Sequence, residues 1–169
     1  MRPLTDLEIR PATESDFEQI WSIFQAVVAP GDTYVFAAET SREDAHEYLL
    51  GEGIASFVAE ADGRVVGFYK LIPNCRDRGS HVANASFMVD PGFQGRGVGR
   101  QLGLHCLREA ERCGYLAMQF NFVVSTNERG LALWRSLGFE IVGTLPGAFQ
   151  HRDLGFVDAF VMFRRLDVE

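Results

Sequence analysis

The sequence predicts an α/β fold, with one mixed, mostly antiparallel central sheet flanked by helices. Short β-rich runs alternate with runs whose apolar residues recur every three or four positions, which is the period of an amphipathic helix. Several strand-like runs follow one another directly, which favours antiparallel pairing. No repeat, low-complexity tract or linker divides residues 1–169, so we expect a single domain of ordinary length.

Composition and charge are those of an ordinary globular protein. Hydrophobic residues make up 47% of the sequence, charged residues 23%, and the formal net charge is -7. An acidic protein repels a phosphate backbone, so we expect no nucleic-acid partner. Residues 1–13 hold no apolar run that could direct export, and no later stretch approaches a membrane span. We therefore expect a cytoplasmic protein without a membrane partner.

The three cysteines, Cys75, Cys106 and Cys113, form no C-x-x-C pair and no His/Cys spacing typical of a metal site. An odd number of cysteines in a protein that is not exported indicates free thiols. Cys106 and Cys113 fall in a helical pattern, and free cysteine behaves as a small apolar residue, so we expect both in the core. We expect no metal.

The N-terminal elements are a strand over residues 4–10 and a helix whose apolar face runs from Phe17 to Val28. Thr13 is a good N-cap residue, and Asp16, three positions later, can face the exposed amides of the first turn. A Pro-Gly-Asp sequence at 30–32 ends that helix. A loop with aromatic residues and a short helix over 43–50 follow.

The remaining elements are separated by glycine turns and polar loops. Asp62-Gly63 between two β-rich runs is a strong hairpin signal, and Gly114 and Gly138 suit the ends of two helices. We expect strands over 55–61, 64–71, 82–90, 116–124, 139–142 and 157–163, helices over 97–113 and 127–137, and a long polar loop between the last two strands.

The most informative segment joins the strand over 82–90 to the helix that begins near Gly97. It contains Gln94-Gly95-Arg96-Gly97-Val98-Gly99, followed by Arg100. Glycines allow a backbone to approach a ligand closely, and the first amides of a helix have no partner within it, so the segment predicts an anion site. Two arginines at the same end suit a diphosphate.

Known phosphate loops and a purely structural turn are the alternatives. A P-loop requires Gly-Lys-Ser/Thr after its glycines, and this chain has Gly97-Val98-Gly99 there. A dinucleotide fold requires a later third glycine and an acidic residue after the next strand, which here ends in Val123-Val124-Ser125. A glycine turn that binds nothing remains an alternative, because short motifs occur by chance.

The chain resembles the GCN5-related N-acetyltransferases (the GNAT family). Gln94-x-x-Gly97-x-Gly99 matches the glycine signature of that family, whose loop holds the pyrophosphate of coenzyme A. Three further landmarks are similar and occur in the family's order: residues 9–16, Val65-Val66-Gly67, and the stretch from Asn127 to Phe139. The resemblance implies acetyl-CoA as cosubstrate and a homodimer formed through the last strands.

The resemblance also implies which residues bind the cofactor. In the family, the strand before the glycine loop separates from its neighbour and its backbone pairs with the pantetheine arm. An asparagine that opens the next helix contacts the same arm, although Asn127 could equally be a helix cap. The implied cofactor residues are Phe87, Met88, Val89, Gln94, Gly95, Arg96, Gly97, Val98, Gly99, Arg100, Asn127 and Trp134.

Trp134 is a departure from the family. Many members carry a tyrosine there that protonates the leaving thiolate, and an indole N–H has no useful acidity. We therefore assign no general acid, since a thiol with a pKa of about 8.5 can leave unprotonated or take a proton from water. Trp134 packs either on the cofactor or in the core.

The candidates for the acceptor site rest on weaker signals. Residues 118–124, Asn127, residues 143–146 and Asp158-Ala159 locally resemble the fungal azetidine-carboxylate acetyltransferases, in which an asparagine at the position of Asn121 contacts the substrate. Asn121 lies among apolar neighbours and, if buried, is either a structural hydrogen-bonding residue or a substrate contact. His151 is a candidate base, because histidine exchanges protons near neutral pH, or an exposed loop residue. Tyr34, Phe36 and Asp158 are further candidates for the acceptor pocket.

The sequence thus predicts an acyltransferase that moves acetyl from acetyl-CoA to the amine of a small molecule, such as an amino acid, by direct attack in a ternary complex. A backbone amide near Val89 would stabilise the charge that develops on the carbonyl oxygen. Two alternatives remain: an enzyme that acetylates proteins or peptides, and a coenzyme A-binding regulator without activity.

Overall fold

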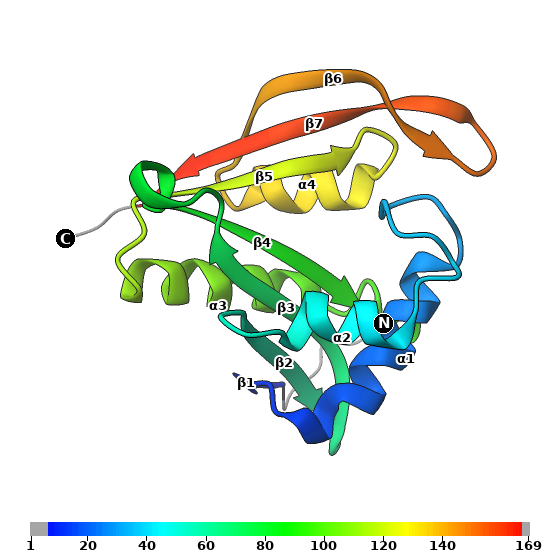
Figure 1. Ribbon diagram of the computed structural model, residues 1–169, viewed down its shortest axis with the longest axis vertical. Coiled ribbons are helices and arrows are strands. Elements are labelled where there is room, and N and C mark those ends of the chain that lie inside the picture. The colour runs from blue at the N-terminus through cyan, green and yellow to red at the C-terminus, as the bar shows by residue number, and fades with distance from the viewer. Residues whose placement is uncertain (1–6, 167–169) are drawn as a thin grey trace.

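The computed structural model describes residues 7–166, which form one seven-stranded sheet with helices on both faces (Figure 1). The strands lie in the order β1-β2-β3-β4-β5-β7-β6. Every neighbouring pair is antiparallel except β4 and β5, which are parallel. The predicted mixed, mostly antiparallel sheet is therefore confirmed.

Most element boundaries agree with the sequence pattern to within a few residues. Gly114 and Gly138, at the ends of α3 and α4, have φ of +81° and +84°, so both are the predicted helix-ending glycines. The strands are β1 (Glu8–Pro11), β2 (Ala55–Ala61), β3 (Arg64–Pro73), β4 (Val82–Val89), β5 (Ala117–Val124), β6 (Glu140–His151) and β7 (Gly155–Arg165). The helices are α1 (Phe17–Val28), α2 (Arg42–Leu50), α3 (Val98–Arg112) and α4 (Glu128–Ser136), with short 3-10 turns η1 (Glu14–Asp16), η2 (Asp77–Gly79) and η3 (Pro91–Phe93).

The core has one layer on each face of the sheet. Leu102, Cys106 and Trp134 belong to the layer that α3 and α4 form with one face. Phe24 and Leu49 belong to the layer that α1 and α2 form with the other. Among residues 7–166, no helix is long and apolar enough to cross a membrane.

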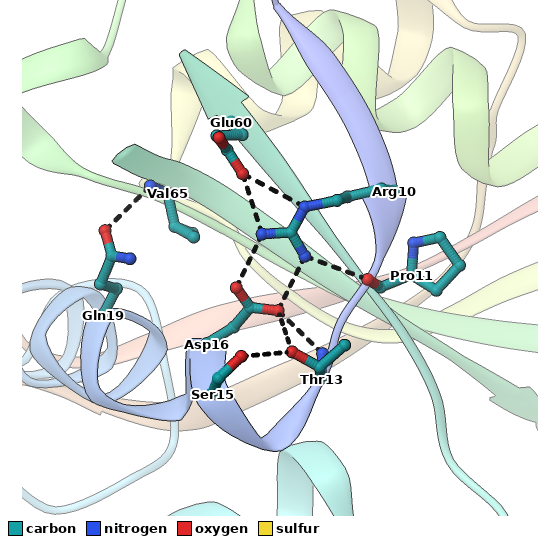
Figure 2. Close-up of polar contacts among 8 residues, drawn as sticks. All are labelled: Arg10, Pro11, Thr13, Ser15, Asp16, Gln19, Glu60 and Val65. Carbon is teal, nitrogen blue, oxygen red and sulfur yellow. Dashed lines mark hydrogen bonds and ion pairs between the residues drawn. The ribbon is translucent and has the colours of Figure 1, made fainter. Parts of the chain in front are cut away.

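The N-terminus of the described chain is held by a charged cluster (Figure 2). The guanidinium of Arg10 on β1 donates to both carboxylate oxygens of Asp16 at 2.8 Å, and to Glu60 on β2 at 2.8 and 3.2 Å. Asp16 is buried and also accepts from the backbone N–H of Thr13 at 2.8 Å. The hydrogen bonds from Arg10 lower the pKa of Asp16 to about 2. Thr13 was expected to be the N-cap of the first helix. It is the N-cap of the short turn η1, which continues into α1, and Asp16 faces an exposed amide as expected, that of Thr13.

The C-terminal hairpin differs from the prediction. Residues 143–156 were expected to be a polar loop, but β6 continues to His151 and β7 begins at Gly155, so only residues 152–154 lie outside the two strands. Glycine and proline at 143, 146 and 147 resemble loop residues, yet they lie at two register shifts of β6, between Ile141 and Gly143 and between Leu145 and Phe149. Bulges at a sheet edge tolerate such residues, because the extra residue is unpaired.

Two smaller expectations need correction or restriction. Cys113 is exposed at the end of α3, whereas Cys106 is buried as expected. The first strand begins at Glu8, and residues 4–6 of the predicted strand lie outside the described residues.

Candidate functional site

A cleft opens where β4 and β5 separate. The two strands pair only at Val82 and Ala83 of β4, opposite Ala117 and Met118 of β5, and then diverge (Figure 1). The cavity between them has a volume of about 870 Å³. Side chains and backbone from both strands, the start of α4, the segment after α1 and the tip of β6 line it. A single interruption of the sheet therefore brings distant parts of the chain to one site.

The edge of β4 that faces the cleft carries free backbone groups. The N–H of Asp90 donates to Val66 of β3 at 2.9 Å, and the carbonyl of Phe87 accepts from the Tyr34 hydroxyl. Because backbone groups alternate sides along a strand, those of Phe87 and Val89 face the cleft, while those of Met88 face β3. Met88 is thus paired with Phe68, and its side chain is buried under α1.

The glycine loop leads from β4 into α3 with its backbone open. Gly95 and Gly97 have φ of +73° and +87°, and no atom lies within 4 Å of where a Cβ would stand on either. Val98 begins α3 with a buried side chain, and Gly99 lies 3.4 Å, measured from an added Cβ, from Leu133 of α4. The loop is thus anchored underneath and exposes the first amides of a 15-residue helix.

Three arginines surround this loop. Arg96 stacks on Phe93, with its guanidinium carbon 4.9 Å from the ring centroid. Its Nε is buried and, within residues 7–166, has no hydrogen-bond partner. Arg100 donates to Ser136 at 3.3 Å, and Arg129 of α4 donates to Gln94 at 3.5 Å. Arg129 was not predicted, because a charged residue on an exposed helix turn carries no signal until the fold brings it to the loop.

The open backbone and the arginines fit a diphosphate. A buried donor without a partner is costly, and a helix N-terminus flanked by arginines stabilises negative charge. The region thus has the geometry and charge of an anion site.

Asn127 and Trp134, the two α4 candidates, have structural contacts. The side-chain oxygen of Asn127 accepts from the N–H of Gly130 at 3.0 Å, so Asn127 is the N-cap of α4. Its amide nitrogen is left for a ligand, since Asn127 also lines the cleft. Trp134 is 9% exposed and packs 4.7 Å from Phe87 and 4.8 Å from Phe120, between ring centroids. Trp134 is thus a residue of the core that also lines the cleft.

The other end of the cleft, which we call the acceptor end, is formed by Tyr34, Phe36, Tyr48, Asn84 and Ser86. Ser86 donates to the Tyr34 hydroxyl at 3.3 Å, and Tyr34 in turn donates to Phe87 of β4. Burial raises the pKa of Tyr34, so its hydroxyl remains a donor. Tyr34 and Phe36 were predicted. Tyr48 was missed, as were Ser86 and Asn84. Asn84 and Ser86 are two residues apart on β4, so their polar side chains lie on one face of the strand, opposite to Phe87. This polar pair was the signal available in the sequence.

Asn121 faces the cleft and is exposed, which corrects the expectation of a buried amide. The pairing of β5 with β7 shifts register between Phe120 and Val123, so Asn121 lies at a bulge of the β5–β7 ladder, in the part of β5 that β4 leaves unpaired. Its amide donates to Asn74 at 2.7 Å and accepts from Gln119 at 2.8 Å. These bonds fix the orientation of Asn121 beside the cleft.

His151 lines the acceptor side of the cleft from the tip of the β6–β7 hairpin. Its Nδ1 accepts from the backbone N–H groups of Asp153 and Leu154 at 3.1 and 3.3 Å. In the neutral ring the proton is then on Nε2, so the ring presents a donor to the cleft. This arrangement favours hydrogen bonding to a ligand over proton abstraction.

Asp158 is not among the residues that line the cleft. Its carboxylate accepts from the N–H of Gly147 at 2.9 Å and thereby holds the second bulge of β6. This contact corrects the expectation that Asp158 belongs to the acceptor pocket. Among residues 7–166, no group of three or more histidine, cysteine or acidic side chains is placed to hold a metal.

A family model described as the acetyltransferase (GNAT) family matches residues 17–139. This stretch includes α1, the glycine loop and α4. The chain belongs to the GNAT acetyltransferase family. The resemblance inferred from the glycine signature is thereby confirmed.

Individual GNAT proteins match to different extents. N-acetyltransferase aca1 of Schizosaccharomyces pombe is 34% identical over 57% of this chain, and this match spans about half, 47%, of that protein. The L-amino acid N-acetyltransferase AaaT of Escherichia coli is 28% identical over 95% of this chain and 99% of its own.

Solved structures agree over nearly the whole chain. A GCN5-related N-acetyltransferase from Kribbella flavida has a TM-score of 0.90 and 41% identity, over 95% of this chain and 98% of that one. The structure of yncA from Salmonella typhimurium, solved with its cofactor acetyl-CoA, has a TM-score of 0.81 and 25% identity, over 98% of this chain and 96% of that one. The GNAT fold therefore extends from β1 to β7.

Proposed function

We propose that this GNAT acetyltransferase moves acetyl from acetyl-CoA to the amine of a small molecule, an amino acid or a related amine, by direct attack in a ternary complex. The observation that carries the proposal is the cleft between β4 and β5, which has a phosphate-type anion site at one end and an aromatic and polar pocket at the other. Such a cleft can hold two ligands end to end.

The residues at the loop end fit coenzyme A. The amides of residues 95–100, with Arg96, Arg100 and Arg129, would hold the diphosphate. The N–H of Phe87 and the carbonyl of Val89, which face the cleft, would pair with the pantetheine arm along the edge of β4. When bound, acetyl-CoA supplies the activated acetyl group.

The chain itself supplies position and charge stabilisation. The N–H of Val89 faces the cleft and can donate to a carbonyl oxygen that gains negative charge. Asn121 and Nε2 of His151 can hold the acceptor from the opposite side. The amine would lose its proton through water, because within residues 7–166 the hydroxyls of Tyr34 and Ser86 bond to each other and to the Phe87 carbonyl and not to Asp32 or Glu128, the two carboxylates that line the cleft.

The shape of the acceptor end favours a small amine over a peptide. The N–H of Arg152, at the tip of the β6–β7 hairpin, donates to the carbonyl of Gly31 at 3.0 Å. This contact joins the hairpin to the segment after α1 across the acceptor end. An extended peptide requires an open groove, which this contact obstructs. The activity in the name of the Escherichia coli relative, L-amino acid N-acetylation, supports the same acceptor class.

The test is acetyl-CoA consumption against amino acids, polyamines, aminoglycosides and short peptides, followed by release of free thiol. Cys75 and Cys113 are exposed and react with thiol dyes, so each assay needs a blank that contains enzyme without acceptor. We expect turnover of a free small amine and little with peptides. Peptides turned over faster than every free amine would contradict the proposal. A panel without turnover, in which acetyl-CoA still raises the Tm, would favour a coenzyme A-binding regulator.

An Asn121→Ala variant tests the acceptor side, with Gln119→Ala as the matched control. Gln119 contacts Asn121 but is not a lining residue of the cleft. We expect kcat/KM for the acceptor to fall about 10-fold in Asn121→Ala, which is the scale of one lost hydrogen bond to a ligand. In the control Gln119→Ala we expect it to fall less than about 5-fold. Full activity of Asn121→Ala would remove Asn121 from the site.

A further inference from the structure

Lys70 is the only lysine in a chain with 16 basic residues, and it is buried. Its side chain is 6% exposed, on a strand at the centre of the sheet. An arginine keeps its proton and would suit a permanent ion pair, whereas a lysine is a compact charge that responds to its surroundings. The one position with a lysine is thus also the most enclosed cationic position among residues 7–166.

The ammonium of Lys70 lies directly behind the wall of the acceptor end. Lys70 on β3 is opposite Ser86 on β4, so both side chains project from the same face of the sheet. Nζ lies 3.1 Å from the centroid of the Tyr48 ring and donates to the Tyr48 carbonyl at 3.0 Å. Tyr48 and Ser86 both line the cleft, whereas Lys70 does not.

No countercharge compensates this ammonium within residues 7–166, where Lys70 makes no ion pair. Its neighbours are neutral: Tyr48 from α2, Ser56 from β2, and Ser86 from β4, which in turn donates to Tyr34. Burial raises the pKa of both tyrosines, so neither supplies negative charge. Burial lowers the pKa of Lys70 to about 8.

We propose that Lys70 determines acceptor specificity, because its ammonium favours an acceptor that carries a carboxylate beside its amine. This inference rests on the proposed function and names the residue that selects within that class. Two of the three ammonium N–H groups have no hydrogen-bond partner within the described chain, and a bound carboxylate would supply the missing negative charge across the wall of Tyr48 and Ser86. A polyamine would be repelled, since charges interact strongly where water is excluded.

A structural role is the alternative, because Tyr48 is near the C-terminal end of α2, where a cation stabilises free carbonyls. A structural residue would affect every acceptor equally. A residue that selects a carboxylate would affect only acceptors that have one. The experiments below separate the two roles by comparing an amino acid with its own amide.

The first experiment measures kcat/KM for L-phenylalanine, L-methionine and L-proline and for their amides, in wild type and Lys70→Met. Comparing variants rather than substrates cancels the different basicity of the two kinds of amine. We expect Lys70→Met to lower kcat/KM for the amino acids about 10-fold or more, mainly through KM, and to change the amides less than 2-fold. Ser56→Ala, which alters the opposite side of Lys70 away from the cleft, should leave the ratio of amino acid to amide unchanged.

Equal losses for the amino acids and the amides would overturn the assignment and leave the acetyltransferase intact. A best acceptor that has no carboxylate would also overturn it. No turnover of any amine would instead overturn the proposed function, so the two failures are distinguishable.

The second experiment requires neither turnover nor a variant. Protein labelled with ¹³C-lysine has a single Cε resonance, because Lys70 is the only lysine, and its shift against pH gives the pKa directly. In the presence of coenzyme A, we expect 10 mM of an amino acid from the same set to raise this pKa by about one unit, while the corresponding amide leaves it unchanged. An unchanged pKa with every amino acid would overturn the proposal.

Discussion

Arg10 and Lys70 are two cations on strands of the same sheet, the first half-buried and the second buried, and they have opposite surroundings. Arg10 donates to Asp16 and Glu60, and these hydrogen bonds raise its pKa (Figure 2). Lys70 has one backbone carbonyl and an aromatic ring, and burial alone lowers its pKa. The first cation has its counterions within the fold, and the second does not.

The presence or absence of counterions distinguishes charged groups that stabilise the fold from charged groups that are available to a ligand. A compensated charge can be explained by the stability of the chain alone. An uncompensated buried charge lowers stability, and natural proteins retain such residues at functional sites. Arg10 lies on the edge strand β1, which β2 and β3 separate from β4, and it does not line the cleft, whereas Lys70 lies behind residues that form it.

The largest effect is expected from breaking the compensated cluster. Asp16→Asn would leave Arg10 with one carboxylate and replace the buried acceptor of the Thr13 amide with a weaker one. We expect the free energy of unfolding to fall by roughly 2–4 kcal/mol, as for other partly buried ion pairs that lose one partner. Urea unfolding measures it. Glu18→Gln, which breaks an exposed pair with Arg42, is the control and should show no measurable loss.

The same cluster predicts a pH dependence. The pKa of Asp16 is about 2 in the folded chain, below its ordinary value of 3.8. Its contribution to stability is therefore complete above about pH 3.8 and is lost as the pH falls from 3.8 towards 2. The difference between wild type and Asp16→Asn should shrink across that window. A constant difference would mean that the loss in the variant comes from packing.

A second comparison concerns two glycines with a similar positive φ, one inside the site and one outside it. Gly97 in the loop has φ of +87° and Gly53 before β2 has φ of +80°, and an added Cβ meets no atom within 4 Å at either. Alanine at each should cost about 1–2 kcal/mol of stability. Only Gly97→Ala places a methyl group where a phosphate would approach, so we expect KM for acetyl-CoA to rise about 10-fold there and to stay unchanged in Gly53→Ala. Equal KM values would contradict the assignment of the loop.

Substitution of Lys70, the uncompensated cation, should affect stability in the opposite way to substitution of Asp16. Lys70→Met removes a buried charge and keeps most of the volume, at the cost of one hydrogen bond to Tyr48. We expect stability at pH 7 to stay within about 1 kcal/mol of wild type or to rise, because apolar replacements of buried charges are often neutral or stabilising. A loss above about 2 kcal/mol would indicate that Lys70 mainly caps α2.

The difference in stability between wild type and Lys70→Met should depend on pH, and the direction of this dependence follows from the pKa of Lys70. The pKa of Lys70 is about 8 in the folded chain and 10.5 ordinarily, so the unfolded chain binds more protons between these values. The penalty for burying the charge is full below pH 8 and is relieved as the pH rises towards 10.5. The free energy of unfolding of the wild type, measured with urea, should therefore rise relative to that of Lys70→Met between pH 7 and 9.5.

The sequence predicted most of the fold and one half of the site. The glycine loop was found because a turn, a close approach and a helix start all require particular residues at 94–100. Both strands of the β6–β7 hairpin were predicted, but their extension over residues 143–151 and 155–156 was missed, since Gly143, Pro146 and Gly147 resemble loop residues. The acceptor end could not be predicted in full, because Tyr34, Tyr48 and Ser86 meet only through tertiary packing. Lys70 gave no signal, because a single charge in a strand becomes unusual only when its burial is known.

The smallest effect is expected at His151. A general base must accept a proton on a lone pair. In the neutral His151 ring the lone pair is on Nδ1, and Nδ1 already accepts hydrogen bonds from the amides of Asp153 and Leu154. His151→Gln keeps a donor near the cleft, so we expect kcat/KM to fall less than 3-fold, with no change in the shape of its pH profile. A loss above 100-fold, together with the disappearance of an acidic limb from that profile, would restore His151 as the base. It would also mean that the hairpin tip rearranges when the acceptor binds, since those two amides would have to release the ring first.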